Sequence, residues 1–128
     1  MTKAVLSPWH VYQPFGRKYY DPIFDYFLSN LLKYKNEYDQ LYFLDSNWGI
    51  PESSNYKIIK TDPSLRYYDA YKETLPQIQE ELVLFIDNDT VIYREGMIRK
   101  TFDLLNDYDI VSIYDTIGEK TFKQLNDK

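Results

Sequence analysis

The chain has no cysteine, one histidine and only four glycines among its 128 residues. Without cysteine it has neither a disulfide framework nor a thiolate metal site, which agrees with a reducing compartment. The scattered glycines form neither a glycine-rich dinucleotide-binding turn nor a P-loop. These absences exclude two common classes of cofactor site.

Long apolar runs and an excess of basic residues are also missing. No run approaches the roughly 18 apolar residues that span a bilayer, and the short run from Lys3 to Ser7 does not resemble a signal peptide. The formal net charge of −5 argues against non-specific nucleic-acid binding, which requires basic patches. We therefore expect a cytoplasmic protein with no transmembrane segment and no nucleic-acid partner.

Hydrophobic residues make up 44% of the chain and aromatic residues 18%, enough for one buried core, so we expect a single domain over residues 1–128. Apolar runs typical of strands alternate with stretches of helical spacing. The expected strands are Lys3–Ser7, Leu41–Asp45, Tyr56–Lys60, Leu82–Ile86 and Ile110–Tyr114, with a short extension at Val91–Tyr93; the expected helices run from Asp21 to about Lys35, from Asp62 to Pro76 and from Glu95 to Asn106. This alternation predicts an α/β fold, a three-layer α/β/α sandwich with a mostly parallel sheet.

The most informative stretch is Leu82–Ile86, followed directly by Asp87-Asn88-Asp89-Thr90. The uninterrupted apolar run indicates a strand buried on both faces, and ligands of open α/β sheets bind beyond the carboxyl ends of strands. If the chain is still extended there, Asp87 and Asp89 point to the same side and a divalent ion, Mg²⁺ or Mn²⁺, would neutralise them. The alternative is a polar turn that only closes the strand.

Other polar and aromatic residues are expected at the same edge of the sheet. The first strand ends at Pro8-Trp9, where Trp9 could stack on a base, and the second ends at Asp45, which could accept a hydrogen bond from a base or ribose. Arg66, one turn into the second helix, would add positive charge beside phosphates. With Asp87 and Asn88, these residues form the predicted nucleotide-binding set.

The order of elements, Asp45 at the end of its strand, Arg66-Tyr67-Tyr68-Asp69-Ala70 and the Asp87-Asn88-Asp89 motif resemble the nucleotide-sugar-binding half of GT-A glycosyltransferases. The resemblance covers Ala4 to about Tyr114. It implies a metal-dependent transfer of sugar from a UDP- or GDP-linked donor to an acceptor hydroxyl on a glycan or a lipid-linked molecule. It also implies a metal site at Asp87 and Asp89, and a location at the membrane periphery if the acceptor is lipid-linked.

The resemblance assigns no catalytic base. We expect the chain to end before the acceptor-binding part of that family, and Asp115, Glu119 and Asp127 are more typical of solvated surface acids. Two other functions fit the same motif. One is a haloacid-dehalogenase-type phosphatase, with Asp87 as nucleophile and Asp89 as acid/base on a Mg²⁺ site. The other is a non-catalytic α/β module that binds a metal and a nucleotide, or only a partner.

Overall fold

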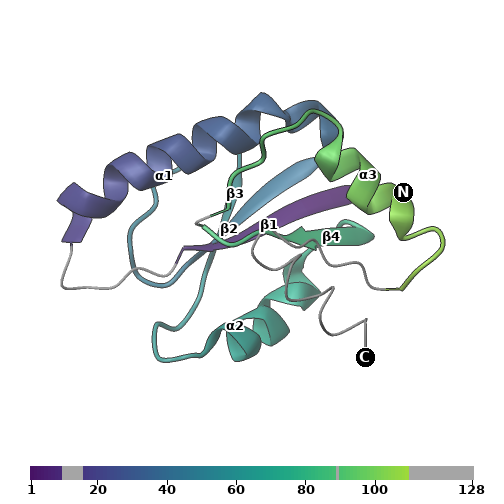
Figure 1. Ribbon diagram of the computed structural model, residues 1–128. Helices are drawn as coiled ribbons and strands as arrows, with labels where there is room; N and C mark the ends of the chain where they lie inside the picture. The colour runs from purple at the N-terminus through teal and green to yellow at the C-terminus, as the bar shows by residue number, and fades with distance from the viewer. Residues whose placement is uncertain (10–15, 89, 110–128) are drawn as a thin grey trace, which may run out of the picture.

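The computed structural model describes residues 1–9, 16–88 and 90–109, without the side chains of Tyr67 and Tyr68. Within these residues the strands form one parallel sheet in the order β3-β2-β1-β4 (Figure 1). The strands are β1 (Lys3–Trp9), β2 (Gln40–Asp45), β3 (Lys57–Lys60) and β4 (Leu82–Phe85). The predicted α/β class with a parallel sheet is therefore confirmed. The strand expected at Ile110–Tyr114 lies outside the described residues.

Helices cover both faces of the sheet, as Figure 1 shows. The longest helix, α1 (Gly16–Lys33), lies on the same face as α3 (Met97–Leu104), and α2 (Tyr67–Thr74) lies on the opposite face. Two short 3₁₀ helices, η2 (Lys35–Glu37) and η3 (Leu75–Gln77), follow α1 and α2. The described part of the chain has no helix with the length and apolar character needed to cross a bilayer.

The alternation of side chains along the strands divides the core into two parts. On one face of the sheet, Val5 and Phe43 pack with Phe27 of α1 and Phe102 of α3. On the other face, a smaller cluster of strand residues packs against Tyr71 of α2. The strands are thus enclosed between two helical layers.

Burial along the sheet corrects one expectation. The inner strands β1 and β2 are buried over almost their full length, whereas the side chains of Leu82, Val83 and Leu84 in β4 are half-buried and Phe85 is 44% exposed. The prediction that this strand is buried on both faces is wrong for the described residues, because among them β4 pairs with β1 alone. Among the described residues, β3 is the strand at the opposite edge of the sheet.

Pro8 does not stop the first strand, contrary to the prediction. It lies within β1, opposite Leu44 of β2. The pairing of β1 with β4 ends where Leu6 meets Phe85. Beyond that point β1 pairs with β2 alone among the described strands, and an edge of this kind tolerates a residue without an N–H group.

Both helix starts predicted at Asp-Pro pairs are wrong. Helix α1 begins at Gly16, which has a φ of 64°, and Pro22 lies inside it. Asp62 instead closes a tight turn, because its carboxylate accepts the backbone N–H of Ser64 at 2.9 Å and the hydroxyl at 2.8 Å. Helix α2 begins five residues later, at Tyr67. The prediction for the third helix is closer, since Ile98 and Phe102 of α3 are buried as expected.

The segment between β4 and α3 is held by two polar side chains. No strand forms at Val91–Tyr93; instead, the side-chain amide of Asn30 in α1 donates to the carbonyl of Ile92 at 2.7 Å and accepts its N–H at 2.8 Å. Buried Glu37 accepts the N–H groups of Gly96 and Arg99, each at 3.0 Å. These are unsatisfied donors of the first turn of α3, so Glu37 caps that helix from a distant segment.

Candidate functional site

The carboxyl ends of all the described strands meet at one edge of the sheet, because the strands are parallel. From β1 the chain adds β2 and then β3 on one side, and it returns to place β4 on the other. The direction of winding therefore reverses between β1 and β4. In open α/β sheets this reversal is the position at which ligands bind.

Asp87 and Asn88 follow β4 at this reversal point. The N–H of Ile86 still donates to the carbonyl of Leu6 at 3.0 Å, and the N–H of Thr90 then donates to the carbonyl of Asp87 at 3.1 Å. The side chain of Asp87 is exposed and that of Asn88 is half-buried. The expected polar residues are thus at the edge of the sheet, and Asp87 is available to a ligand.

The geometry expected for Asp87 changes because the chain turns after this residue. The hydrogen bond between Asp87 and Thr90 spans three residues, which is the pattern of a β-turn. Alternation along an extended strand therefore does not set the direction of the Asp87 side chain. Asp89 lies outside the described residues.

Asp45, at the end of β2, is almost completely buried. Its Oδ1 accepts the backbone N–H of Trp48 at 2.6 Å, and its Oδ2 accepts those of Gly49 at 2.9 Å and Ile50 at 2.8 Å. The carboxylate thus organises the loop that follows its own strand. Direct contact of Asp45 with a base or ribose would compete with these hydrogen bonds.

The same loop is held from the other side by Arg17, a residue outside the predicted nucleotide-binding set. The guanidinium of Arg17 donates to the carbonyl of Trp48 at 2.5 Å and lies 4.7 Å from the centre of the Trp48 ring. It also forms an ion pair with Asp21, with 3.6 Å between Nε and Oδ2. Asp45 therefore binds N–H groups of the loop, and Arg17 binds its carbonyl groups. No local sequence pattern marks this role of Arg17.

The position of Trp9 corrects another expectation. Trp9 is fully buried, with its ring centre 5.0 Å from that of Phe24 and 6.4 Å from that of Tyr20. Along β1 it alternates onto the same face as Val5, toward α1. Trp9 is therefore a core residue and cannot stack on a base in this arrangement. Pro8 is also buried.

Arg66 is exposed and lies at the N-cap position of α2, one residue before the helix rather than one turn inside it. The positive end of the helix dipole is therefore at the carboxyl edge, and Arg66 is the residue that immediately precedes it. Asp62 is four residues earlier, and the hydrogen bonds from the backbone N–H and the hydroxyl of Ser64 lower the pKa of its carboxyl group. Arg66 is exposed to solvent at this edge, and its contact with phosphates stays a prediction.

The described residues contain no group of three or more histidine or acidic side chains that could hold a metal ion. A Mg²⁺ ion that bridges phosphates needs only one or two protein carboxylates, because phosphate oxygens and water complete its coordination. Asp87 is exposed and fits one such position. The residues of this edge are therefore compatible with a metal bound together with a diphosphate.

No protein-family model, curated protein or solved structure matches the chain. A function is therefore inferred from the geometry of the carboxyl edge. That geometry brings Asp87, Asn88 and Arg66 to the edge with exposed or partly exposed side chains. It assigns Asp45 to a loop and Trp9 to the core.

Proposed function

We propose that the protein binds a nucleoside-diphosphate sugar with Mg²⁺ or Mn²⁺ and transfers the sugar to an acceptor hydroxyl, as a GT-A-type glycosyltransferase. The observation that carries the proposal is the position of Asp87, two residues after the end of β4, at the point where the strand order reverses beside β1. A ligand at this position lies beside a carboxylate that can share a divalent cation with a diphosphate.

The reaction forms a bond between the acceptor oxygen and the anomeric carbon and breaks the bond from that carbon to the diphosphate. The acceptor proton passes to a base, and the diphosphate departs with its charge. A bound divalent cation would stabilise that charge. Asp87 would hold the cation together with Asp89, and Arg66 would add a positive charge near the phosphates.

The edge also supports a role for the loop at residues 46–50. This loop follows β2, the strand beside β1, and its backbone is fixed on one side by Asp45 and on the other by Arg17. A fixed loop at a ligand-binding edge can present its groups without a further cost in conformational entropy. We therefore assign Asp45 a positioning role, in place of the direct contact expected from the sequence.

Titration calorimetry of UDP and GDP, each with Mn²⁺ and with EDTA, tests the proposal. We expect binding that requires the metal and is abolished in Asp89→Ala and weakened in Asp87→Ala. Asp103→Ala, which removes an exposed carboxylate on α3, and Asp115→Ala are the controls and should bind as the wild type does. Equal nucleotide affinity in the wild type and Asp89→Ala would overturn the proposal.

The experiment also separates the alternative functions. If neither nucleotide binds, a phosphate analogue such as orthovanadate is titrated with Mg²⁺. Binding of that analogue, with its loss in Asp87→Asn, would favour the phosphatase, in which Asp87 is the nucleophile. If neither the nucleotides nor the phosphate analogue binds, a non-catalytic module is favoured.

A further inference from the structure

Helix α1 carries exposed apolar and aromatic side chains on a face that does not contact the sheet. Tyr19, Ile23 and Tyr26 recur at spacings of four and three residues and are 55%, 38% and 65% exposed. Residues at this spacing lie on one side of a helix. The same side continues through Asn30 to Lys33, the last residue of the helix.

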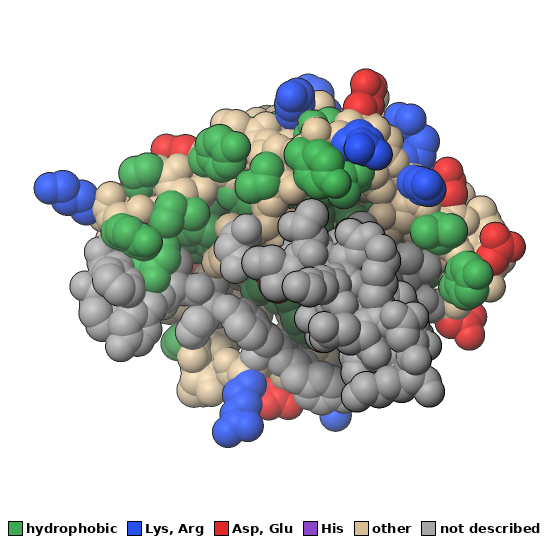
Figure 2. Space-filling model, in the orientation of Figure 1, with side chains coloured by type: hydrophobic (Ala, Val, Ile, Leu, Met, Phe, Trp, Pro, Cys, Tyr) green, Lys and Arg blue, Asp and Glu red, His purple; other side chains and the backbone are tan. Residues whose placement is uncertain are grey.

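The segment after β4 extends this surface. Because Asn30 binds both backbone groups of Ile92, the neighbouring residues Val91 and Tyr93 are held beside this side of α1. Val91 is 46% exposed and Tyr93 is 74% exposed. We call the set of Tyr19, Ile23, Tyr26, Val91 and Tyr93 the apolar stripe. Figure 2 shows hydrophobic side chains in a row over α1.

Positive charge is concentrated at one end of the apolar stripe. Lys33 and Lys35 lie at the end of α1 and just after it, and the Arg94 guanidinium is 5.8 Å from the centre of the Tyr93 ring. Lys and Arg side chains gather over the same end of the row in Figure 2. This local positive charge contrasts with the net charge of −5 for the whole chain.

The acidic residues of α1 point away from the apolar stripe. Asp25 immediately precedes Tyr26, so it is rotated by about 100° around the helix. Asp21 is rotated further and is paired with Arg17. An anionic surface that approaches the apolar stripe therefore meets Lys33 before it meets a carboxylate of this helix.

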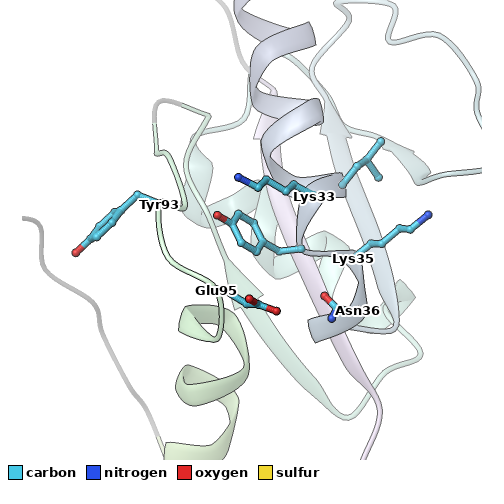
Figure 3. Close-up of a pocket in the computed structure, with 7 residues that line it drawn as sticks. Lys33, Lys35, Asn36, Tyr93 and Glu95 are labelled. Carbon is cyan, nitrogen blue, oxygen red and sulfur yellow. The ribbon is translucent and has the colours of Figure 1, made fainter.

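A pocket of about 530 Å³ lies at the positive end of the apolar stripe, between the end of α1 and the segment that precedes α3 (Figure 3). Its lining includes Lys33, Lys35, Asn36, Tyr93 and Glu95. In Figure 3, Lys33 extends toward the side where Tyr93 lies, and Lys35 extends the other way. The pocket thus offers ammonium and amide donors beside an aromatic ring, with one carboxylate.

We propose that this face docks on an anionic phospholipid bilayer, with the apolar stripe in the interfacial region and a headgroup phosphate at the Lys33 end of the pocket. Tyrosine suits the interface because it has an apolar body and a polar tip. Basic residues beside an apolar helix face add electrostatic attraction to anionic lipids. A protein partner would not require basic residues at this place. The inference does not depend on the glycosyl transfer proposed above.

Vesicle flotation of the full chain tests the inference. We expect binding to phosphatidylcholine vesicles that contain phosphatidylglycerol, no binding to phosphatidylcholine alone, and weaker binding at high salt. Lys33→Glu with Lys35→Glu should lower the partition by about tenfold or more. Lys57→Glu with Lys72→Glu makes the same charge change on β3 and α2, away from α1, and should leave the partition unchanged.

Two further variants test the separate contributions. Glu95→Gln removes the carboxylate from the pocket lining and should strengthen binding to the anionic vesicles. Tyr26→Ser with Tyr93→Ser should weaken it, whereas Tyr108→Ser, at a tyrosine that is 62% exposed outside the apolar stripe, should not. Circular dichroism establishes that each variant is folded. If the wild type does not bind the vesicles, the inference is overturned and a protein partner is favoured. Equal losses of vesicle binding in the two double-lysine variants would also overturn it.

Discussion

The carboxylate of Glu37 accepts the backbone N–H of Arg99, which is 62 residues later in the sequence. Its second oxygen accepts the N–H of Gly96, so one buried side chain joins η2 to the first turn of α3. The segment that follows the candidate site is thereby anchored at its far end. Asn30 anchors the middle of the same segment through Ile92.

Replacement of Glu37 by Gln should destabilise the protein. The amide group can accept one of the two N–H groups but brings a donor toward the other, so we expect a loss of about 1–3 kcal/mol in the free energy of unfolding. Urea denaturation measures this change. Glu52→Gln, an exposed residue, is the matched control and should change the stability by less than about 0.5 kcal/mol. Equal stability of the two variants would contradict the capping role.

Asn30→Ala should also destabilise the protein, because it leaves the N–H and carbonyl groups of Ile92 without their partner. We expect a loss of about 1–3 kcal/mol, and faster amide hydrogen exchange at Ile92 measured by NMR. Ser29→Ala, an exposed neighbour on the same helix, is the control. Unchanged exchange at Ile92 in Asn30→Ala would show that other contacts hold the segment.

The effects of Asp45 and Arg17 should be coupled, because both side chains bind the loop at Trp48 and Gly49. Asp45→Asn and Arg17→Met should each lower the free energy of unfolding and change the near-ultraviolet circular dichroism of Trp48. In a double-mutant cycle we expect an interaction free energy of about 0.5–3 kcal/mol. Strict additivity would mean that the two residues act on the loop independently.

Alkaline pH should destabilise the protein through tyrosines whose pKa is raised in the folded state. Burial raises the pKa of Tyr38 to about 12, and burial followed by the hydrogen bond to Glu80 raises the pKa of Tyr42 to about 12. These folded-state pKa values lie above the ordinary tyrosine value of about 10, so folding favours the protonated hydroxyl groups. Their contribution to the free energy of unfolding is complete below pH 10 and is lost as the pH rises toward 12. Urea denaturation from pH 8 to 11 should therefore show falling stability, with a smaller fall in Tyr38→Phe.

Trp9→Phe separates the core role of Trp9 from a ligand-binding role. The smaller ring leaves space among Phe24 and Tyr20, so we expect a loss of about 1–3 kcal/mol in the free energy of unfolding. Nucleotide affinity in the presence of Mn²⁺ should remain that of the wild type. A large loss of affinity in a stably folded variant would restore the stacking role expected from the sequence.

The sequence predicts the parts of this fold that depend on local patterns. The apolar runs of β1, β2 and β4 and the spacing of Ile98 and Phe102 are visible along the chain, and parallel pairing then places Asp45 and Asp87 at one edge. The start of α1 is not predicted correctly by such a local pattern. Pro22 is typical of a first turn, but the helix begins earlier, at a glycine with positive φ.

The roles of particular side chains depend on contacts that no local pattern encodes. Asp45 was expected to face a ligand, yet the loop after β2 folds back so that its backbone N–H groups meet the carboxylate. Pro8 predicts the end of the first strand and a ligand-facing position for Trp9. Because β1 continues through Trp9, alternation places this side chain in the core. Glu37 and Asn30 act on residues about sixty positions away.

The edge strand β3 also affects how the molecule meets other copies of itself. It is four residues long, and its first and last residues, Lys57 and Lys60, are exposed and alternate onto opposite faces of the sheet. A strand from a second molecule that paired here would bring its own backbone between two ammonium groups. Short, lysine-bearing edges of this kind oppose edge-to-edge aggregation. The protein therefore has a built-in barrier to growth of its sheet beyond β3.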